Sequence, residues 1–310
     1  MENDTPPAFL HAMGTSLQND TKPLRFAATR LNSLLKTLEI TDIADFEPIV
    51  LVANFVTMLV QYPQGFMVIL EPFDSRTPHI PDPILQLACL DASIAIRNVF
   101  QKYSSVVLTS GTLSPLDMYP KMLNFHPVVR ASFQMSIARP CICPMIISKG
   151  PDQTPVSSRF EVRDDEGVKR NYGAMLEQLA SVTPDGMVVF FPSYSYMQTI
   201  VTFWHKQGVI QQLSRHKLLF VETKDIMETT LALGNFRKAC DCGRGAIFFS
   251  VARGKVAEGI DFDRHYGRAV VLIGIPFQYT LSHVLRARLA YLRDTFHIRE
   301  QDFLTFDALR

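Results

Sequence analysis

The segment SVARGKVAEGIDF, residues 250–262, contains residue types suited to binding phosphate. It contains a Gly254-Lys255 pair, which is also part of the P-loop that cradles nucleotide phosphates. A P-loop has the form G-x-x-x-x-G-K-[ST], with an earlier glycine and a hydroxyl for Mg²⁺ after the lysine. Here Phe249 stands at the first glycine position and Val256 at the hydroxyl position. The segment is therefore not a P-loop.

The same residues can still bind a nucleic acid or a nucleotide. Basic side chains neutralise phosphate oxygens, and glycines allow the backbone to approach a ligand closely. Carboxylates accept hydrogen bonds from a ribose or from a basic group across a cleft. The residue types alone leave an ordinary polar turn between a strand and a helix as the alternative. The residues concerned are Arg253, Gly254, Lys255, Glu258, Gly259 and Asp261.

Two other polar segments follow apolar runs, TSGTLSP at 109–115 and PSYSY at 192–196. In open α/β sheets, ligands bind beyond the carboxyl ends of the strands, so these segments are further candidates. The alternatives are a helix N-cap for the first segment and tyrosines that pack on the following helix for the second. The candidate residues are Ser110, Gly111 and Thr112, and then Ser193 and Tyr194.

The elements that position these segments alternate between strands and helices. Nearly continuous apolar runs predict strands covered on both faces, and helical segments between them predict a parallel α/β sheet. We expect the last four strands to form one sheet. The strands are predicted at 105–110, 186–193, 217–222, 245–252 and 268–277, and the helices at 171–182, 195–213, 227–240 and 282–296.

The first part of the chain has a different pattern. It is predicted to be helical over 24–60, with a strand at 65–73, a proline-rich connector at 75–83 and a helix at 89–103. The longest apolar run, 49–60, is shorter than the ~20 residues that span a bilayer. We therefore expect it to be a buried core helix.

Composition narrows the class of protein. The chain has 310 residues and a net charge of +1, so any binding surface for nucleic acid must be local, and no membrane partner is expected. Its five cysteines are typical of reduced thiols in the cytosol or nucleus. The two C-x-C pairs, at 141/143 and 240/242, lack the usual zinc spacing, and no metal site is expected. The polar segment 150–170 is interpreted as a linker.

Several segments resemble the XPD family of iron–sulfur superfamily-two DNA helicases, the helicases of TFIIH. The resemblance lies in TSGTLSPLD (109–117), in SVARGKVAEGIDF and in YLRDTFHIREQDFLTFDALR (291–310). It extends to 23–48 and 170–197, and so covers nearly the whole chain. The related Fanconi-anaemia and chromosome-cohesion helicases share versions of the first two segments. The match at 23–48 and at the C-terminal end favours the XPD family.

The resemblance implies roles for the candidate residues. Motif III, which couples loss of the γ-phosphate to domain movement, is matched by Ser110, Gly111 and Thr112. In motifs IV and V, Ser193, Tyr194, Arg253 and Lys255 are expected to bind nucleic acid, and Glu258, Gly259 and Asp261 the nucleotide. No complete catalytic set is expected, because the family's Walker A loop, DEAH box and four iron–sulfur cysteines are not found in this sequence.

The resemblance also implies a domain plan. Residues 1–85 match the remainder of a mainly helical arch domain, 86–150 the end of the first motor domain, and 165–310 a second RecA-like motor domain truncated before motif VI. The expected fold class is α/β, with the RecA-like parallel sheet in the second motor domain.

The implied function is that of an ATP-dependent 5′→3′ DNA helicase subunit of TFIIH, acting in the nucleus in nucleotide excision repair and transcription initiation. ATP and Mg²⁺ would be bound together with the missing half, and a 4Fe-4S cluster is expected only in the full-length protein. The implied partners are single-stranded DNA, a von Willebrand-like regulatory subunit and the kinase-activating module. A catalytically inactive truncated scaffold that binds TFIIH partners is the alternative. A Rossmann-like metabolic enzyme would need a G-x-G-x-x-G after the first strand, and none is present.

Overall fold

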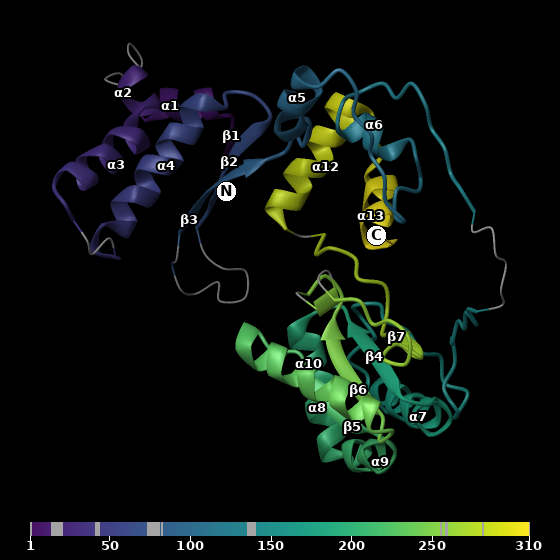
Figure 1. Ribbon diagram of the computed structural model, residues 1–310. Coiled ribbons are helices and arrows are strands. Elements are labelled where there is room, and N and C mark those ends of the chain that lie inside the picture. The colour runs from purple at the N-terminus through teal and green to yellow at the C-terminus, as the bar shows by residue number, and fades with distance from the viewer. Residues whose placement is uncertain are drawn as a thin grey trace. The chain divides into compact units, whose positions relative to one another are not determined.

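The computed structural model describes residues 2–13, 21–40, 44–72, 81, 83–134, 141–254, 256–257, 260–280 and 282–309. These residues form two compact units (Figure 1). The first unit comprises the described residues of 1–132 and 278–306, and the second those of 133–277 and 307–309. The domain boundaries expected at residues 85, 150 and 165 divide the sequence by motif rather than by packing, and they remain a prediction.

The second unit is built on a parallel sheet of four strands. The spatial order is β5-β6-β4-β7, and all three pairings are parallel. The prediction that these strands share one parallel sheet is confirmed. The strands are β4 (Gly186–Phe191), β5 (Leu218–Val221), β6 (Ala246–Val251) and β7 (Ala269–Leu272).

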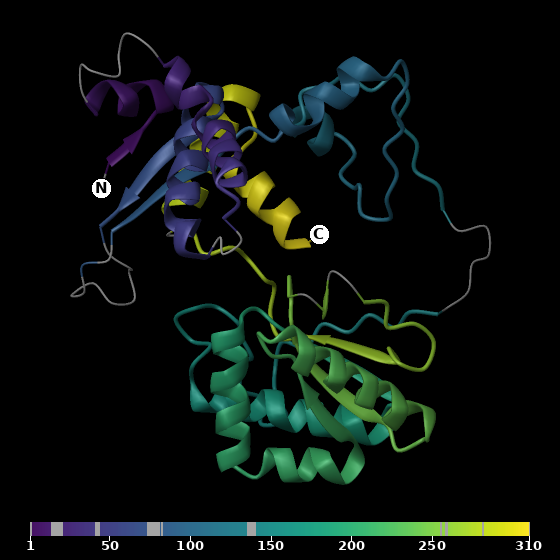
Figure 2. The ribbon, with the colours of Figure 1, turned by 60° about the vertical axis from the view of Figure 1, so that its left-hand side comes forward.

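Helices cover both faces of this sheet, as Figure 2 shows. All six residues of β6 are buried. Ile247 and Phe249 belong to the core under α7, α8 and α9, while Ala246 and Phe248 belong to the core under α10. Burial on both faces explains why β6 has an unbroken apolar sequence. The helices are α7 (Glu166–Val182), α8 (Tyr194–Lys206), α9 (Val209–His216) and α10 (Ile226–Asp241).

The core on the α8 side is centred on Trp204, which is fully buried. Its ring centroid lies 6.2 Å from that of Phe191 and 6.0 Å from that of Phe249, distances typical of favourable aromatic pairs. The indole Nε1 donates a hydrogen bond of 2.8 Å to the carbonyl of Lys169. Gly173 makes room for the ring, because a β-carbon at that position would stand 2.9 Å from Nε1.

Local signals set the helix ends. Asp165, Ser193 and Asp225 are the N-cap residues of α7, α8 and α10, and each side chain accepts a backbone N–H from the first turn. The single helix predicted over 195–213 is two helices. Gly208 interrupts it with φ 79, a left-handed conformation that glycine adopts without steric cost.

The first unit contains an antiparallel sheet in the order β1-β2-β3. The sequence predicts β2 (Phe66–Glu71) but not β1 (Glu2–Asp4) or β3 (Ile84–Cys89), which is mostly exposed and lacks a continuous buried face. The predicted helical N-terminal region is confirmed. The remaining helices are α1 (Pro6–Ala12), α2 (Lys22–Arg25), α3 (Ala27–Thr37), η2 (Ala44–Phe46), α4 (Glu47–Gln61), α5 (Ser93–Lys102), α6 (Met118–Met122), α12 (His283–Phe296) and α13 (Glu300–Leu309).

Helix α4 forms as predicted, but it is not a buried core helix. Among its residues only Leu59 is buried, while Leu51 and Val52 are 69% and 59% exposed. These side chains line an apolar hollow of about 480 Å³ together with residues of α1. The stretch Ala44–Gln61 is long and apolar enough to cross a membrane by length and composition alone, and one such helix is weak evidence of insertion.

The strand predicted at 105–110 is not formed. The segment has no regular secondary structure, and Val107 is 82% exposed. No strand of the described residues pairs with it. A β-strand is held by hydrogen bonds to its neighbours, so an apolar run alone does not make one.

Candidate nucleic-acid interface

Three strand ends of the second unit meet at one edge of the sheet. Phe191 at the end of β4 lies opposite Val251 at the end of β6, and β5 ends nearby at Val221. Beyond these ends, the N–H of Ala252 donates to the carbonyl of Phe191 at 2.8 Å, and the N–H of Glu222 donates to that of Phe249 at 2.8 Å. Ligands bind beyond the carboxyl ends of such strands, so this edge is the candidate site.

A buried carboxylate joins the three strand ends. Glu222, directly after β5, is 1% exposed. Its Oε1 accepts a hydrogen bond of 2.6 Å from the Tyr194 hydroxyl. Its Oε2 accepts hydrogen bonds from the Ser250 hydroxyl at 2.6 Å and from the Val251 N–H at 3.0 Å. Three donors compensate for the burial of the charge, which is otherwise costly.

The first residues of the predicted motif V form a tight turn beside this carboxylate. The N–H of Gly254 donates to the carbonyl of Val251 at 2.8 Å. Arg253 has φ 67, a left-handed conformation that is uncommon for a residue other than glycine. Its guanidinium contacts the carboxylate of Asp307 at 2.7 Å. The turn thus holds an arginine at the strand edge with its backbone under strain.

Tyr194 points its hydroxyl at Glu222 and remains a phenol at neutral pH. Burial, and then the hydrogen bond and charge of Glu222, raise the pKa of Tyr194 to about 12. The alternative interpretation is that both tyrosines pack on the following helix; both lie within α8, and they differ in their partners. The Tyr196 side chain is buried and donates to the carbonyl of Arg163 at 2.9 Å.

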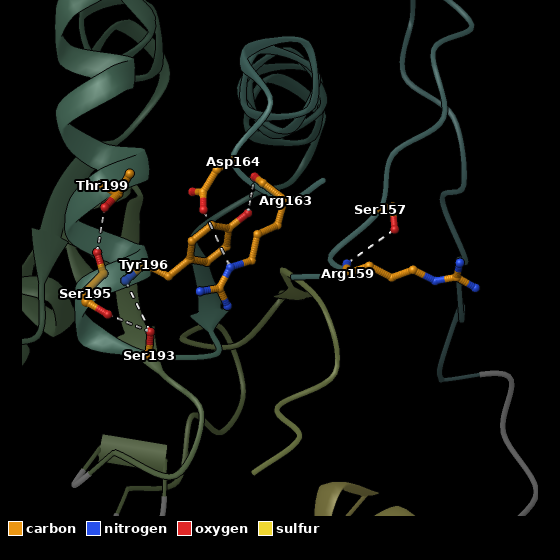
Figure 3. Close-up of polar contacts among 8 residues, drawn as sticks. All are labelled: Ser157, Arg159, Arg163, Asp164, Ser193, Ser195, Tyr196 and Thr199. Atoms are coloured by element: carbon orange, nitrogen blue, oxygen red, sulfur yellow. Dashed lines mark hydrogen bonds and ion pairs between the residues drawn. The ribbon is translucent and has the colours of Figure 1, made fainter. Parts of the chain in front are cut away.

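Arg163 is not among the predicted residues, and Figure 3 shows it beside the start of α8. Its guanidinium lies 4.8 Å from the ring centroid of Tyr196 and 4.5 Å from that of Phe160. Its buried Nε has no hydrogen-bond partner among the described residues, because the carboxylate of Asp164 is 3.9 Å away. The polarity of the segment 150–170 predicts a linker, but this end of it belongs to the second unit and packs on Tyr196 of α8. The only signal in the sequence is an arginine three residues after a phenylalanine.

The structure describes only some of the predicted residues. Ser193 is the N-cap of α8, accepting the Tyr196 N–H at 3.2 Å. Asp261 is exposed, and its carboxylate has no hydrogen-bond or ion-pair partner in the part of the chain that the structure describes. Lys255, Glu258 and Gly259 lie outside the described residues.

The predicted motif III residues belong to the first unit. Ser110 and Thr112 form a small hydroxyl turn, with 3.1 Å between their side-chain oxygens and 3.2 Å from the Thr112 N–H to Ser110 Oγ. All three residues, including Gly111, are exposed. They are not a helix N-cap, because α6 begins later, after Asp117.

The cysteines do not form a metal centre in the described part of the chain. All five thiols are free, and no group of three or more His, Cys, Asp and Glu residues there could hold an ion. Cys240 is buried, which raises its pKa to about 11 and disfavours the thiolate that binds metals. The described residues therefore do not fit an iron–sulfur cluster.

Comparisons with known proteins give the class of two segments and then the family. Residues 176–310 match the family described as "Helicase C-terminal domain", and residues 1–65 match the "Helical and beta-bridge domain". An XPD helicase structure shares the fold, with a TM-score of 0.51 and 19% identity over 84% of this chain and 43% of that one.

The chain is 59% identical over its whole length to the general transcription and DNA repair factor IIH helicase subunit XPD of Arabidopsis thaliana, of which it covers 41%. It is 54% identical over 99% of its length to the corresponding subunit of Schizosaccharomyces pombe, of which it covers 40%. The chain belongs to the XPD family of TFIIH helicase subunits. It spans about two fifths of the length of these relatives.

Proposed function

We propose that the second unit is the second motor domain of an ATP-dependent 5′→3′ DNA helicase and binds the backbone of single-stranded DNA at its strand edge. The observation that supports this proposal is the Glu222 network, which gathers the ends of β4, β5 and β6. It brings the segments that resemble motifs IV and V to one edge of the sheet.

Each predicted residue has a role at this edge. Arg253 and Lys255 neutralise phosphates, and the guanidinium of Arg253 exchanges its contact with Asp307 for one with DNA. Ser193 and Tyr194 line the path of the strand. Arg163 adds a cation next to them, with its charge already stacked on Tyr196.

The nucleotide is bound by residues that follow the turn. Glu258, Gly259 and Asp261 are assigned to the nucleotide, which the first motor domain would hold together with Mg²⁺, and Ser110, Gly111 and Thr112 to the coupling between loss of the γ-phosphate and movement. Positioning and charge neutralisation, rather than covalent chemistry, carry phosphoryl transfer.

Because the sequence has no P-loop or DEAH box, this chain alone turns over no ATP above background. DNA-stimulated turnover by the purified chain would contradict this.

A second function, binding of TFIIH subunits in the nucleus, is favoured by the apolar hollow of α1 and α4. Exposed apolar side chains gathered in one place are typical of protein contacts. The proposed partners are the von Willebrand-like regulatory subunit and the kinase-activating module. Each purified partner is titrated with the chain and with its Leu51→Asp variant. Weaker binding to the variant indicates a specific contact at this hollow, and equal binding indicates none.

The DNA-binding proposal is tested by the anisotropy of a fluorescent single-stranded oligonucleotide titrated with the chain at several salt concentrations. Replacing Arg253 or Lys255 by Gln should weaken binding and reduce the salt slope by about 0.7 for each phosphate that the variant no longer neutralises. Arg264→Gln is the matched control. Arg264 also has positive φ and is 84% exposed, but the carbonyl of its neighbour His265 accepts the N–H of Gly186, at the opposite edge of the sheet.

Wild-type and Arg264→Gln proteins should give the same dissociation constant. Absence of salt-dependent binding by the wild-type chain, or an equal loss in all three variants, would contradict the proposal.

A further inference from the structure

We infer that Glu222 is a positioning residue for nucleic-acid binding: its carboxylate fixes the Tyr194 side chain and the turn at Arg253 relative to one another. The inference deepens the proposed function and rests on it. Glu222 lies outside the segments that resemble helicase motifs, and it does not contact the strand of DNA itself.

Each of the two carboxylate oxygens accepts hydrogen bonds from a different segment. Oε1 accepts from Tyr194, which begins α8 just beyond the end of β4. Oε2 accepts from Ser250 and from the backbone N–H of Val251, where the turn toward Arg253 begins. A single rigid group therefore determines both where the tyrosine ring lies and where the turn starts.

The backbone of the turn lies directly against this group. A β-carbon on Gly254 would stand 2.7 Å from Oε1 and 2.9 Å from Oε2, closer than real contacts allow. The turn is thus held by a hydrogen bond at Val251, and only a residue without a β-carbon fits beside the carboxylate at position 254. A change in the carboxylate is therefore expected to alter the backbone at Arg253, which lies between Val251 and Gly254 in the sequence.

The chemistry of the three donors predicts what removal of the charge does. A carboxylate only accepts hydrogen bonds, and the Val251 N–H only donates, whereas the hydroxyls of Tyr194 and Ser250 can do either. In Glu222→Gln, the amide oxygen can take the Oε2 position and keep the bonds to Ser250 and Val251. The amide NH₂ then takes the Oε1 position and donates to the Tyr194 oxygen.

Glu222→Gln is therefore expected to keep the fold while reversing the hydrogen bond at Tyr194. The tyrosine becomes the acceptor, its own O–H is free to turn elsewhere, and the ring loses its charged anchor. Tyr194→Phe removes the same bond from the other side. If the carboxylate acts through this bond, the effects of the two substitutions on the Kd for single-stranded DNA should not be additive.

The experiment uses the full chain with Glu222→Gln, Tyr194→Phe and both together. Glu228→Gln is the matched control, because Glu228 is an exposed glutamate in the first turn of α10 that accepts a hydrogen bond of 2.9 Å from the Thr223 hydroxyl. We expect Glu222→Gln to raise the Kd for single-stranded DNA about ten-fold, equivalent to about 1.4 kcal/mol. The double variant should bind no more weakly than Glu222→Gln, and Glu228→Gln should bind like the wild type.

Two further measurements do not depend on DNA. The ¹³Cζ NMR signal of Tyr194, assigned by its loss in Tyr194→Phe, should shift in Glu222→Gln but not in Glu228→Gln. Hydrogen exchange of the peptide that covers Ala252 to Gly254 should accelerate in Glu222→Gln, since a neutral amide oxygen accepts the hydrogen bond from the Val251 N–H less strongly than a carboxylate does. A residue that merely stabilised the core would leave the tyrosine signal in place.

The outcomes separate the inference from the proposed function. If the wild-type chain binds DNA and Glu222→Gln binds equally well, the inference is overturned and the proposed function stands. An unchanged tyrosine signal or unchanged exchange also overturns the inference. If the wild-type chain does not bind DNA, the proposed function fails, and the inference that depends on it fails with it.

Discussion

Gly254 lies directly against the carboxylate of Glu222, although 32 residues separate them in the sequence. A β-carbon at Gly254 would stand within 3.0 Å of both carboxylate oxygens and 2.8 Å from the carbonyl of Val251. Because backbone and a buried, hydrogen-bonded carboxylate surround it, neither neighbour can move cheaply.

We therefore expect Gly254→Ala to lower the free energy of unfolding by about 1–3 kcal/mol, the usual cost of overpacking. Gly234→Ala is the control, because Gly234 lies in α10 with nothing within 4 Å of the added β-carbon. That substitution should stabilise the chain by about 0.5–1 kcal/mol. Urea unfolding followed by tryptophan fluorescence measures both, and a neutral Gly254→Ala would show that the turn can relax away from Glu222.

The left-handed backbone of Arg253 gives a second prediction. At φ 67, an L-residue with a β-carbon is strained, whereas glycine is not. Arg253→Gly and Arg253→Ala both remove the cation and its ion pair with Asp307, so the difference between them isolates the effect of the backbone.

We expect Arg253→Gly to be more stable than Arg253→Ala by about 1 kcal/mol in urea unfolding. Both variants should lose affinity for single-stranded DNA to the same extent. Equal stability of the two would mean that the turn is not left-handed in solution.

The parallel sheet could be predicted because its strands are buried on both faces. A run such as AIFFSV in β6 has only one structural explanation once helices flank it, and the caps at Ser193 and Asp225 fix where those helices begin. The antiparallel strand β3 gave no such signal, because most of its side chains are exposed. The apolar run at 105–110 predicted a strand that does not form, because a strand also needs a neighbouring strand to share its hydrogen bonds.

The candidate site was predicted only in part, for a related reason. Short motifs locate residues that lie close together in the sequence, such as Arg253 and Lys255. Glu222 lies in none of the segments that resemble helicase motifs, and its importance comes from Tyr194 and Ser250, each 28 residues away along the chain. Only the register of the three strands brings these side chains together.

Trp204 gives a third prediction because it is the only tryptophan in the chain. It is fully buried in the second unit, so its emission should be blue-shifted and should report the unfolding of that unit alone. Trp204→Phe removes the Nε1 bond to Lys169 and leaves space beside Phe249. We expect it to cost roughly 2 kcal/mol of unfolding free energy, measured by circular dichroism. A cost near zero would mean that the core refills around phenylalanine.

The last prediction concerns alkaline pH. Burial, together with Glu222, raises the pKa of Tyr194 to about 12 from its ordinary value of 10. The folded state therefore holds the phenolic proton more tightly than the unfolded state. The stability that Tyr194 contributes is fully present below pH 10 and is lost as the pH rises toward 12.

In urea unfolding followed by Trp204 fluorescence, the free energy of unfolding should fall less steeply over this window in Tyr194→Phe than in the wild type. Glu222→Gln should lie between them, because burial, the largest cause, remains, while Glu228→Gln should follow the wild type. Parallel curves for Tyr194→Phe and the wild type would show that the pKa of this hydroxyl is not raised in the folded protein.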